Sequence, residues 1–378
     1  MDPLTHTLSG VLLSRTGFYQ KWGRPATIAL VVGAVIPDID HITLRLLGPI
    51  AYLKYHRGFT HSIIGIMPLA ILIAFWVPIF FKQTKERIDY LNLAGLGILG
   101  IIAHIFLDLI TSYGTQIFFP FDNYRYSLDL VFIIDPYFSL IFILPPILWT
   151  FKKEKARTIA VTAIIMIFAY LAFAYATKNL AAKSAKAEMQ RININASRIE
   201  AIPMPLSPFK WSVFIEDEKR FYQMDIDIVR DTINTLAFDK ISSDDAIHND
   251  INKSAYRASE QSRGHPRQRR GSGRDEARSE AYFQHTPQRR ARSNAGMRSY
   301  DALYMIKKAD SLEMVKVYKW FARFPVVTMK MSEGEHIIEY YDIRFNSMPP
   351  RKPFLLKVVL DKDGVFKDGE LFFHSIKP

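Results

Sequence analysis

Two acidic residues and three histidines lie within 25 residues of one another, between Pro37 and Ser62. The stretch reads P-D-I-D-H, then a short basic connector, then H-R-G-F-T-H-S, and it leads directly into a long apolar run. Carboxylates and imidazoles at the mouth of a membrane helix are costly in a low dielectric unless something binds them. Because both groups are natural metal ligands, the stretch predicts a metal site at the membrane.

A second pair of the same residue types lies on a later apolar segment. His104 and Asp108 are spaced i, i+4 within Leu91–Ile110, so both side chains leave one face of a helix. Such a pair can bind a metal ion, or it can be a buried hydrogen-bonded pair that holds helices together. His6, near the start of the chain, supplies a further imidazole, although a single histidine is more often a satisfied polar residue than a ligand.

Together, these histidines and acids exceed the needs of one tetrahedral site and suit two or more ions. We predict that seven side chains bind metal, namely His6, Asp38, His41, His56, His61, His104 and Asp108. The chain has no cysteine, so the ligands are nitrogen and oxygen, which favours Zn, Mn, Fe or Mg. We expect a divalent metal ion, zinc first, with Mn and Mg left open.

Three further residues are predicted to assist catalysis. Asp40 points away from Asp38 and is available as a general base or to hold a ligand in place. Arg57 and Arg125 are the nearest cations on the same side of the membrane and could hold an anionic group bidentately. The alternatives are a helix-ending turn at P-D-I-D-H and ordinary interfacial anchoring by the two arginines.

The elements that must position these residues lie in residues 1–177, which are membrane-like, whereas the remainder of the 378 residues is polar. A span needs ~20 apolar residues to cross ~30 Å of hydrocarbon. We predict four full spans, at Ser62–Phe81, Leu91–Ile110, Leu128–Phe151 and Thr158–Ala176. Two shorter segments, Pro3–Arg15 and Ala26–Ile36, should form an N-terminal helical hairpin.

Two polar features refine this reading of the helices. Asp2 is a candidate cap for the first helix, and Thr60 or Ser62 can cap the helix that follows the histidines. The third span contains Asp129 and Asp135, which could support the metal ligands or cap a helix break at Pro136.

Basic residues in the short loops predict the orientation of the spans. One side receives ten of them and is predicted to be cytoplasmic: Arg15, Lys21, Arg24, Lys82, Lys85, Arg87, Lys152, Lys153, Lys155 and Arg157. The other side receives four: Arg45, Lys54, Arg57 and Arg125. On this topology every predicted ligand lies toward the outer face, at one membrane depth.

The polar remainder predicts a small, mostly β extramembrane domain at residues 178–241 and 299–378, placed outside the cytoplasm. After a polar helix at 178–191, alternating segments of period two indicate antiparallel strands. These segments lie at 211–215, 221–228, 314–321, 326–331, 336–345 and 354–361. K-D-G-V at 362–365 and K-D-G-E at 367–370 are turn signals.

An Arg-rich stretch at residues 242–298 interrupts these strands. It has few large apolar residues, so it cannot bury enough surface to offset its ordering entropy, and we predict a disordered insert. The net charge of +12 then reflects this insert and the cytoplasmic loops. We therefore expect no nucleic-acid partner.

Five blocks of the first 177 residues resemble the YdjM-like membrane-bound metal-dependent hydrolases, which are LexA-regulated, inner-membrane-associated proteins of bacteria. The blocks are D-P-L-T-H-T-L-S-G, G-A-V-I-P-D-I-D-H, H-R-G-F-T-H-S, A-H-I-F-L-D-L-I-T-S-Y-G-T and D-L-V-F-I-I-D-P. That family is distantly similar to zinc-dependent phospholipase C. The resemblance implies that metal-activated water attacks an ester, a phosphoester first of all.

We therefore expect a multi-pass inner-membrane hydrolase whose partners are membrane lipids and whose substrate is an amphiphilic ester or phosphoester. One alternative is a metal-ion or proton transporter, although the sequence shows no repeated halves of the kind common in transporters. A catalytically inactive membrane anchor for the β domain is another. The sequence leaves the oligomeric state open.

Overall fold

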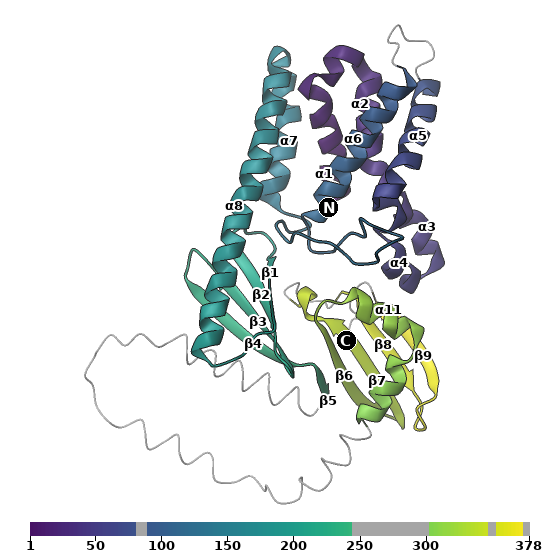
Figure 1. Ribbon diagram of the computed structural model, residues 1–378, viewed down its shortest axis with the longest axis vertical. Helices are drawn as coiled ribbons and strands as arrows, with labels where there is room; N and C mark the ends of the chain where they lie inside the picture. The colour runs from purple at the N-terminus through teal and green to yellow at the C-terminus, as the bar shows by residue number, and fades with distance from the viewer. Residues whose placement is uncertain (81–88, 244–301, 347–352, 373–378) are drawn as a thin grey trace, which may run out of the picture.

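A bundle of apolar helices forms the N-terminal half of the molecule, and two small β-sheets lie at one end of it (Figure 1). The structure, a computed structural model, describes residues 1–80, 89–243, 302–346 and 353–372. The predicted disordered insert at 242–298 lies outside the described residues, apart from the end of one short strand.

The first two helices lie side by side. In α1 (Pro3–Leu13), Asp2 accepts a hydrogen bond from the Thr5 backbone N–H, as predicted for a helix cap. A π-helical turn at Ser14–Phe18 leads into α2 (Tyr19–Val35), and positive φ angles at Gly17 and Gly23 break the helical path. A Cβ on Gly10 would lie 2.7 Å from the Leu30 carbonyl oxygen, so the two backbones are in close contact.

The remaining helices of the bundle follow in chain order. A 3-10 turn, η2 (Ile36–Ile39), leads into two short helices, α3 (Asp40–Leu47) and α4 (Pro49–Tyr55), and then a second 3-10 turn, η3 (Phe59–His61). The longer helices are α5 (Ile63–Phe80), α6 (Tyr90–Leu109), α7 (Pro136–Phe151) and α8 (Ala156–Arg191). Of the two predicted caps for α5, Ser62 fills the role, because its Oγ accepts from the Gly65 N–H at 3.1 Å.

Within the described residues, three helical stretches are long and apolar enough to cross a membrane: Pro3–Leu47, Tyr90–Leu109 and Lys153–Arg191. A fourth arises if Pro49–His61 and Ile63–Ile79, bent by 68°, form one broken span. Three to four candidate spans therefore replace the predicted four spans plus hairpin.

The predicted span at Leu128–Phe151 differs most from the structure. Its helix, α7, begins only at Pro136, because the Asp135 carboxylate caps it by accepting from the N–H groups of Tyr137 and Phe138. At about 1.5 Å per residue, its 16 residues reach only about 24 Å. Asp135 also accepts a hydrogen bond from the Tyr170 hydroxyl at 2.7 Å.

The C-terminal half contains two sheets where one small β domain was predicted. The first is antiparallel and has the order β1 (Arg198–Pro203), β2 (Lys210–Glu216), β3 (Arg220–Asp227), β4 (Thr232–Asp239). The second has the order β5 (Ile241–Ser243), β6 (Pro325–Ser332), β7 (Glu335–Asp342), β8 (Leu355–Leu360), β9 (Phe366–Phe372). Its pairs are antiparallel except β5 with β6, which run parallel.

Two predictions for this half are wrong in detail. The segment 314–321 is a helix, α11 (Glu313–Phe321), whose Val315, Tyr318 and Phe321 face a core, so its apolar residues follow a helical rather than an alternating period. K-D-G-E at 367–370 lies inside β9, where it pairs with β8. By contrast, Gly364 of K-D-G-V has the φ of +77° that a turn requires.

Polar and apolar contacts join the two halves. Arg323, just after α11, donates to both carboxylate oxygens of Asp129 at 2.9 and 3.0 Å and also contacts Glu200. Arg344 donates to the Ser112 carbonyl at 3.0 Å. Leu53 of α4 and Tyr113 of the loop after α6 belong to the same buried cluster as α11 and the second sheet.

Candidate metal centre

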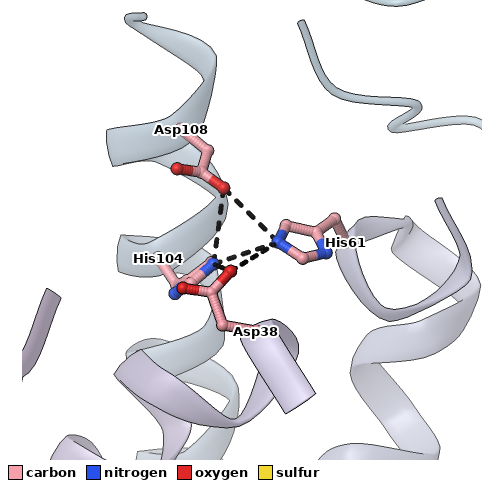
Figure 2. Close-up of side chains that lie close together, drawn as sticks. All are labelled: Asp38, His61, His104 and Asp108. Atoms are coloured by element: carbon pink, nitrogen blue, oxygen red, sulfur yellow. Dashed lines mark hydrogen bonds and ion pairs between the residues drawn. The ribbon is translucent and has the colours of Figure 1, made fainter. Parts of the chain in front are cut away.

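Four side chains from three separate segments converge on one point (Figure 2). Asp38 comes from η2, His61 from η3, and His104 and Asp108 from α6. One ligand atom from each lies within 4.8 Å of all the others. We call these four residues the metal cluster.

Each segment places its side chain for a local reason. Pro37 lacks an N–H to continue α2, and η2 follows as a short 3-10 turn that carries Asp38. The i, i+4 spacing on α6 puts His104 and Asp108 on one face, as predicted. His61 is positioned where η3 ends, one residue before the Ser62 cap of α5.

Glycines allow α2 and α6 to approach closely behind the cluster. A Cβ on Gly33 would lie 2.5 Å from the Gly97 carbonyl oxygen, and one on Gly100 would lie 2.5 Å from the Leu30 carbonyl oxygen. Small residues of this kind are what close helix packing in a membrane requires. The approach lets His104 Nδ1 donate to the Ala34 carbonyl oxygen at 2.7 Å.

The ligand atoms of the cluster face one another at short range. His61 Nε2 and His104 Nε2 are 3.1 Å apart, and they lie 3.3 and 3.4 Å from Asp108 Oδ2. Both nitrogens lie farther from Asp38 Oδ1, at 3.5 and 3.6 Å. His61, His104 and Asp108 are fully buried, whereas the Asp38 side chain is 21% exposed, so the cluster is open on the Asp38 side.

Hydrogen bonds at the far side of each imidazole set its tautomer. His104 donates from Nδ1 to the Ala34 carbonyl, and His61 donates from Nδ1 to Thr60 Oγ1 at 2.9 Å. The Thr60 hydroxyl in turn donates to Asp40 Oδ2 at 3.1 Å. Each Nε2 therefore presents a lone pair toward two carboxylates, an arrangement that needs a cation.

The donor set of two imidazole nitrogens and two carboxylate oxygens fits a divalent ion. Such a set suits Zn, Mn or Fe better than it suits soft metal ions, which prefer sulfur ligands. Asp108 Oδ2 is buried and accepts no hydrogen bond from the described part of the chain, as expected of an oxygen whose partner is a metal.

The second oxygen of Asp108 has different neighbours. Arg57 Nη2 lies 2.8 Å from Asp108 Oδ1, and His6 Nε2 lies 3.2 Å from it. The amino group of Met1 contacts the same oxygen. The His6 ring stacks on the His104 ring with centroids 3.9 Å apart. His6 thus borders the metal cluster through Asp108 and His104.

Three other predicted residues, His41, His56 and Arg57, form a neighbouring network around Asp40. His56 Nδ1 lies 3.0 Å from Asp40 Oδ1, and Asp40 Oδ2 accepts from the Arg57 N–H at 3.1 Å. His41 lies beside His56, with ring centroids 4.5 Å apart, and its ring nitrogens lie within 3.1 Å of the Tyr52 hydroxyl. Asp40 is also linked through Thr60 to the far side of His61, which is the position of a residue that orients a ligand.

Arg125 organises backbone beside the site. Its guanidinium donates to the carbonyls of Leu53, His56 and Gly114 at 2.6 to 3.2 Å. Burial lowers the pKa of Arg125 to about 10, which still leaves it charged at neutral pH. Asp129 lies away from the cluster, in the pair with Arg323.

Sequence reasoning singled out neither Thr111 nor the Ala34 carbonyl, and it predicted Thr60 only as a helix cap. Thr111 Oγ1 accepts from Arg57 Nη1 at 3.2 Å and donates to the Asp108 carbonyl. Thr60 and Thr111 lie next to predicted ligands in H-R-G-F-T-H-S and A-H-I-F-L-D-L-I-T, which was the available signal. The Ala34 carbonyl carries no sequence signal, because its role depends on which helix packs against it.

Comparison with known protein families agrees with the family resemblance that the five sequence blocks indicated. The family described as YdjM inner membrane protein matches residues 1–181. A protein of Bacillus subtilis (strain 168), described as uncharacterized protein YfhP, is 29% identical over 178 residues, which cover 45% of this chain and 53% of that relative. The chain thus spans about half the length of the curated relative that it matches. No solved structure matches.

The predicted family is therefore confirmed for the helical half, which carries the metal cluster. Over residues 1–181, the chain belongs to the YdjM inner membrane protein family.

Proposed function

We propose that this protein is a membrane-embedded, metal-dependent hydrolase that cleaves an ester, a phosphoester first of all, in an amphiphilic substrate. The observation that carries the proposal is the metal cluster: two imidazole Nε2 atoms and two carboxylates, three of the four side chains fully buried, with their lone pairs turned toward one point. Uncompensated, such a group in an apolar bundle would be strongly destabilising.

A divalent ion, zinc first, held by Asp38, His61, His104 and Asp108 would activate water and neutralise negative charge on the ester oxygens. The exposed side of Asp38 is where water and substrate can approach. Arg57 neutralises the outer oxygen of Asp108, so the carboxylate can keep Oδ2 directed at the ion. Asp40, through Thr60, holds His61 in the tautomer that leaves Nε2 free.

The membrane placement supports an amphiphilic substrate. Loop charges predict that the cluster and the β half lie at the extracytoplasmic face, where lipid head groups and lipid-linked phosphates are within reach. A hydrolytic site at the boundary between hydrocarbon and water suits a molecule with an apolar tail and a polar ester.

A transport function has less support from the distribution of polar residues. A proton or ion relay should extend across the bilayer, but α5 contains no Asp, Glu, His, Lys or Arg, and the only such residues in α6 are His104 and Asp108 near its end. The candidate ligands thus lie at one end of the bundle.

Metal analysis of the purified full chain tests the proposal. We expect at least about one divalent ion per wild-type chain. We expect Asp108→Asn and His104→Gln to lose that metal. Matched controls are Asp135→Asn, a buried acid that caps α7, and His336→Gln, a buried histidine of β7; both should retain the metal.

The same preparations are then assayed for cleavage of a phospholipid in vesicles and for zinc flux. Cleavage that is present in wild type and both controls but absent in Asp108→Asn supports the hydrolase. Wild-type protein without bound metal refutes it. Bound metal with zinc flux and no cleavage favours transport, and bound metal with neither activity favours an inactive anchor.

A further inference from the structure

A stripe of exposed apolar side chains runs beside the open face of the metal cluster. It consists of residues at helical spacing from the end of α2 through η2 into α3, namely Val35, Ile39, Ile42 and Leu46. Their exposure rises along the stripe from 36% at Val35 to 85% at Leu46, and the adjacent Leu47 is 70% exposed. We call these five residues the apolar stripe.

The apolar stripe continues a surface that already belongs to candidate membrane spans. Residues 3–47 form one apolar helical stretch, and Ile28, seven residues before Val35, is exposed on α2. On the neighbouring α5, Ile63, Ile64 and Met67 are exposed in the same way. Exposed side chains of this type on a spanning helix face lipid tails. Figure 1 shows α3 continuing from the bundle on the side of α5.

Phe59 connects the two surfaces. It belongs to η3, which packs against both η2 and α5, and its side chain is 47% exposed. The turn that carries His61 therefore also presents an aromatic ring to the outside, between α5 and the apolar stripe.

Charges at the far end of the stripe suit the head-group region. Arg45 lies in the last turn of α3 and Lys54 in α4, and both are exposed. Apolar side chains on one face with Arg and Lys beside them are typical of helices that lie in the membrane interface. Long basic side chains there reach lipid phosphates while their stems cover apolar surface.

Asp38 links this surface to the site. It is the only residue of the metal cluster with a partly exposed side chain, and it lies between Val35 and Ile39 in sequence. Ile42 follows Asp38 by four residues, the spacing that places two side chains on one helix face. A molecule that approaches Asp38 along this face of the chain would therefore contact the apolar stripe.

We propose that the apolar stripe lies in the interfacial layer of the bilayer and is the entrance by which an acyl-chain amphiphile reaches the metal cluster. The tail stays in lipid along Val35, Ile39 and Ile42, and the polar ester meets the ligands at Asp38. The assignment of the entrance rests on the proposed hydrolase, whereas burial of the stripe in lipid does not depend on any activity.

Site-directed spin labelling tests the placement, because the chain contains no cysteine. Leu46→Cys is labelled with a nitroxide in the full chain, reconstituted into vesicles of phosphatidylcholine and phosphatidylglycerol, and its collision rates with oxygen and with a water-soluble nickel chelate are compared. Met67→Cys on α5 is the lipid-facing control, and Val229→Cys, 69% exposed between β3 and β4, is the aqueous control.

A Leu46 label that favours oxygen, as the Met67 label should, supports the proposal. A Leu46 label as accessible to the nickel chelate as the Val229 label overturns it, whether or not the protein binds metal. Lipid burial of Leu46 in protein that binds no metal would refute the proposed hydrolase and leave the interfacial placement standing.

The entrance itself is tested with Ile42→Asp, assayed with a long-chain phospholipid in vesicles. We expect kcat/KM to fall about tenfold or more, since a charge in the tail path opposes entry of an acyl chain, while the metal content stays at the wild-type level. Unchanged kcat/KM in a variant that retains its metal would refute the role of the stripe as an entrance.

Discussion

At the scale of single residues, the two oxygens of Asp108 have different partners. Oδ2 faces His61 and His104, and Oδ1 faces Arg57 and His6. A fully buried carboxylate needs compensation on both sides, and a metal ion would supply it only on one. The outer partners are therefore part of what makes the inner oxygen available as a ligand.

Asp40 is the second residue whose position defines its role. Its carboxylate lies behind His61 and is linked to it through Thr60, with Asp40 Oδ2 at 3.6 Å from His61 Nδ1. In the proposed hydrolase, a group in that place would orient a ligand and would not contact a substrate bound on the Asp38 side. Carboxylates behind metal-bound histidines commonly raise metal affinity in this way.

We predict that Asp40→Asn lowers metal affinity about 10- to 100-fold without abolishing binding. The loss follows because the amide is a weaker acceptor for the Thr60 hydroxyl, which frees the His61 ring to change tautomer. Competition with a chromophoric chelator measures the affinity. Asp135→Asn, remote from the cluster, is the control, and equal affinities in Asp40→Asn and wild type would exclude the orienting role.

At the scale of elements, the cluster depends on the contact between α2 and α6. Gly33, Gly97 and Gly100 bring the two backbones together, and this contact places the Ala34 carbonyl 2.7 Å from His104. Without it, the far nitrogen of His104 would lose its acceptor, and the ring would lose the bond that sets its orientation.

Gly100→Ala should therefore destabilise the bundle by about 1–3 kcal/mol, the usual cost of overpacking. It should also weaken metal binding, because the new Cβ would lie 2.5 Å from the Leu30 carbonyl oxygen and push the helices apart. Thermal unfolding in detergent and chelator competition measure the two effects. Gly95→Ala on the same helix is the matched control, since a Cβ there meets no described atom within 4 Å. Comparable stability in Gly100→Ala and Gly95→Ala would show that the close contact between α2 and α6 does not limit the stability of the bundle.

At the scale of the whole molecule, the sheets are attached to the bundle through a buried ion pair. Burial opposes ionisation of Asp129, but the Arg323 guanidinium holds the pKa of that carboxyl below its ordinary value. A carboxyl with a lowered folded-state pKa stabilises the fold above its unfolded pKa of 3.8, and this contribution is lost as the pH falls through the lower, folded value.

Arg323→Gln should loosen this attachment and cost about 3 kcal/mol at pH 7, because it removes the bidentate partner of buried Asp129 and leaves only Lys178, at 3.9 Å, to offset its charge. Hydrogen exchange of residues 127–131 should rise in the variant. The difference in stability between wild type and variant should narrow as the pH falls from 3.8 through the lowered pKa of Asp129, because wild type then loses the stabilisation by the charged carboxylate. Arg220→Gln removes an exposed pair with Asp239 within the first sheet and should change little. A stability difference between wild type and Arg323→Gln that stays constant down to pH 2 would contradict the stabilising role of the Arg323–Asp129 pair.

The sequence by itself determined the residue types of the site and its place in the chain. H-x-x-x-D on an apolar helix already implied that His104 and Asp108 share one face, since helical spacing is a local property. The cost of burying polar groups in an apolar segment likewise pointed to a bound cation before any coordinates. The family followed from the order of short blocks, each of which is local.

Only the tertiary structure decided which predicted ligands meet. Asp38 and His61 join His104 and Asp108, while His41 and His56 face Tyr52 and Asp40. Asp129 was likewise indistinguishable from a site residue until it paired with Arg323, almost 200 positions away. The segment 314–321 became a helix because a core lay along one of its faces. These outcomes depend on contacts between distant segments, which short-range spacing does not encode.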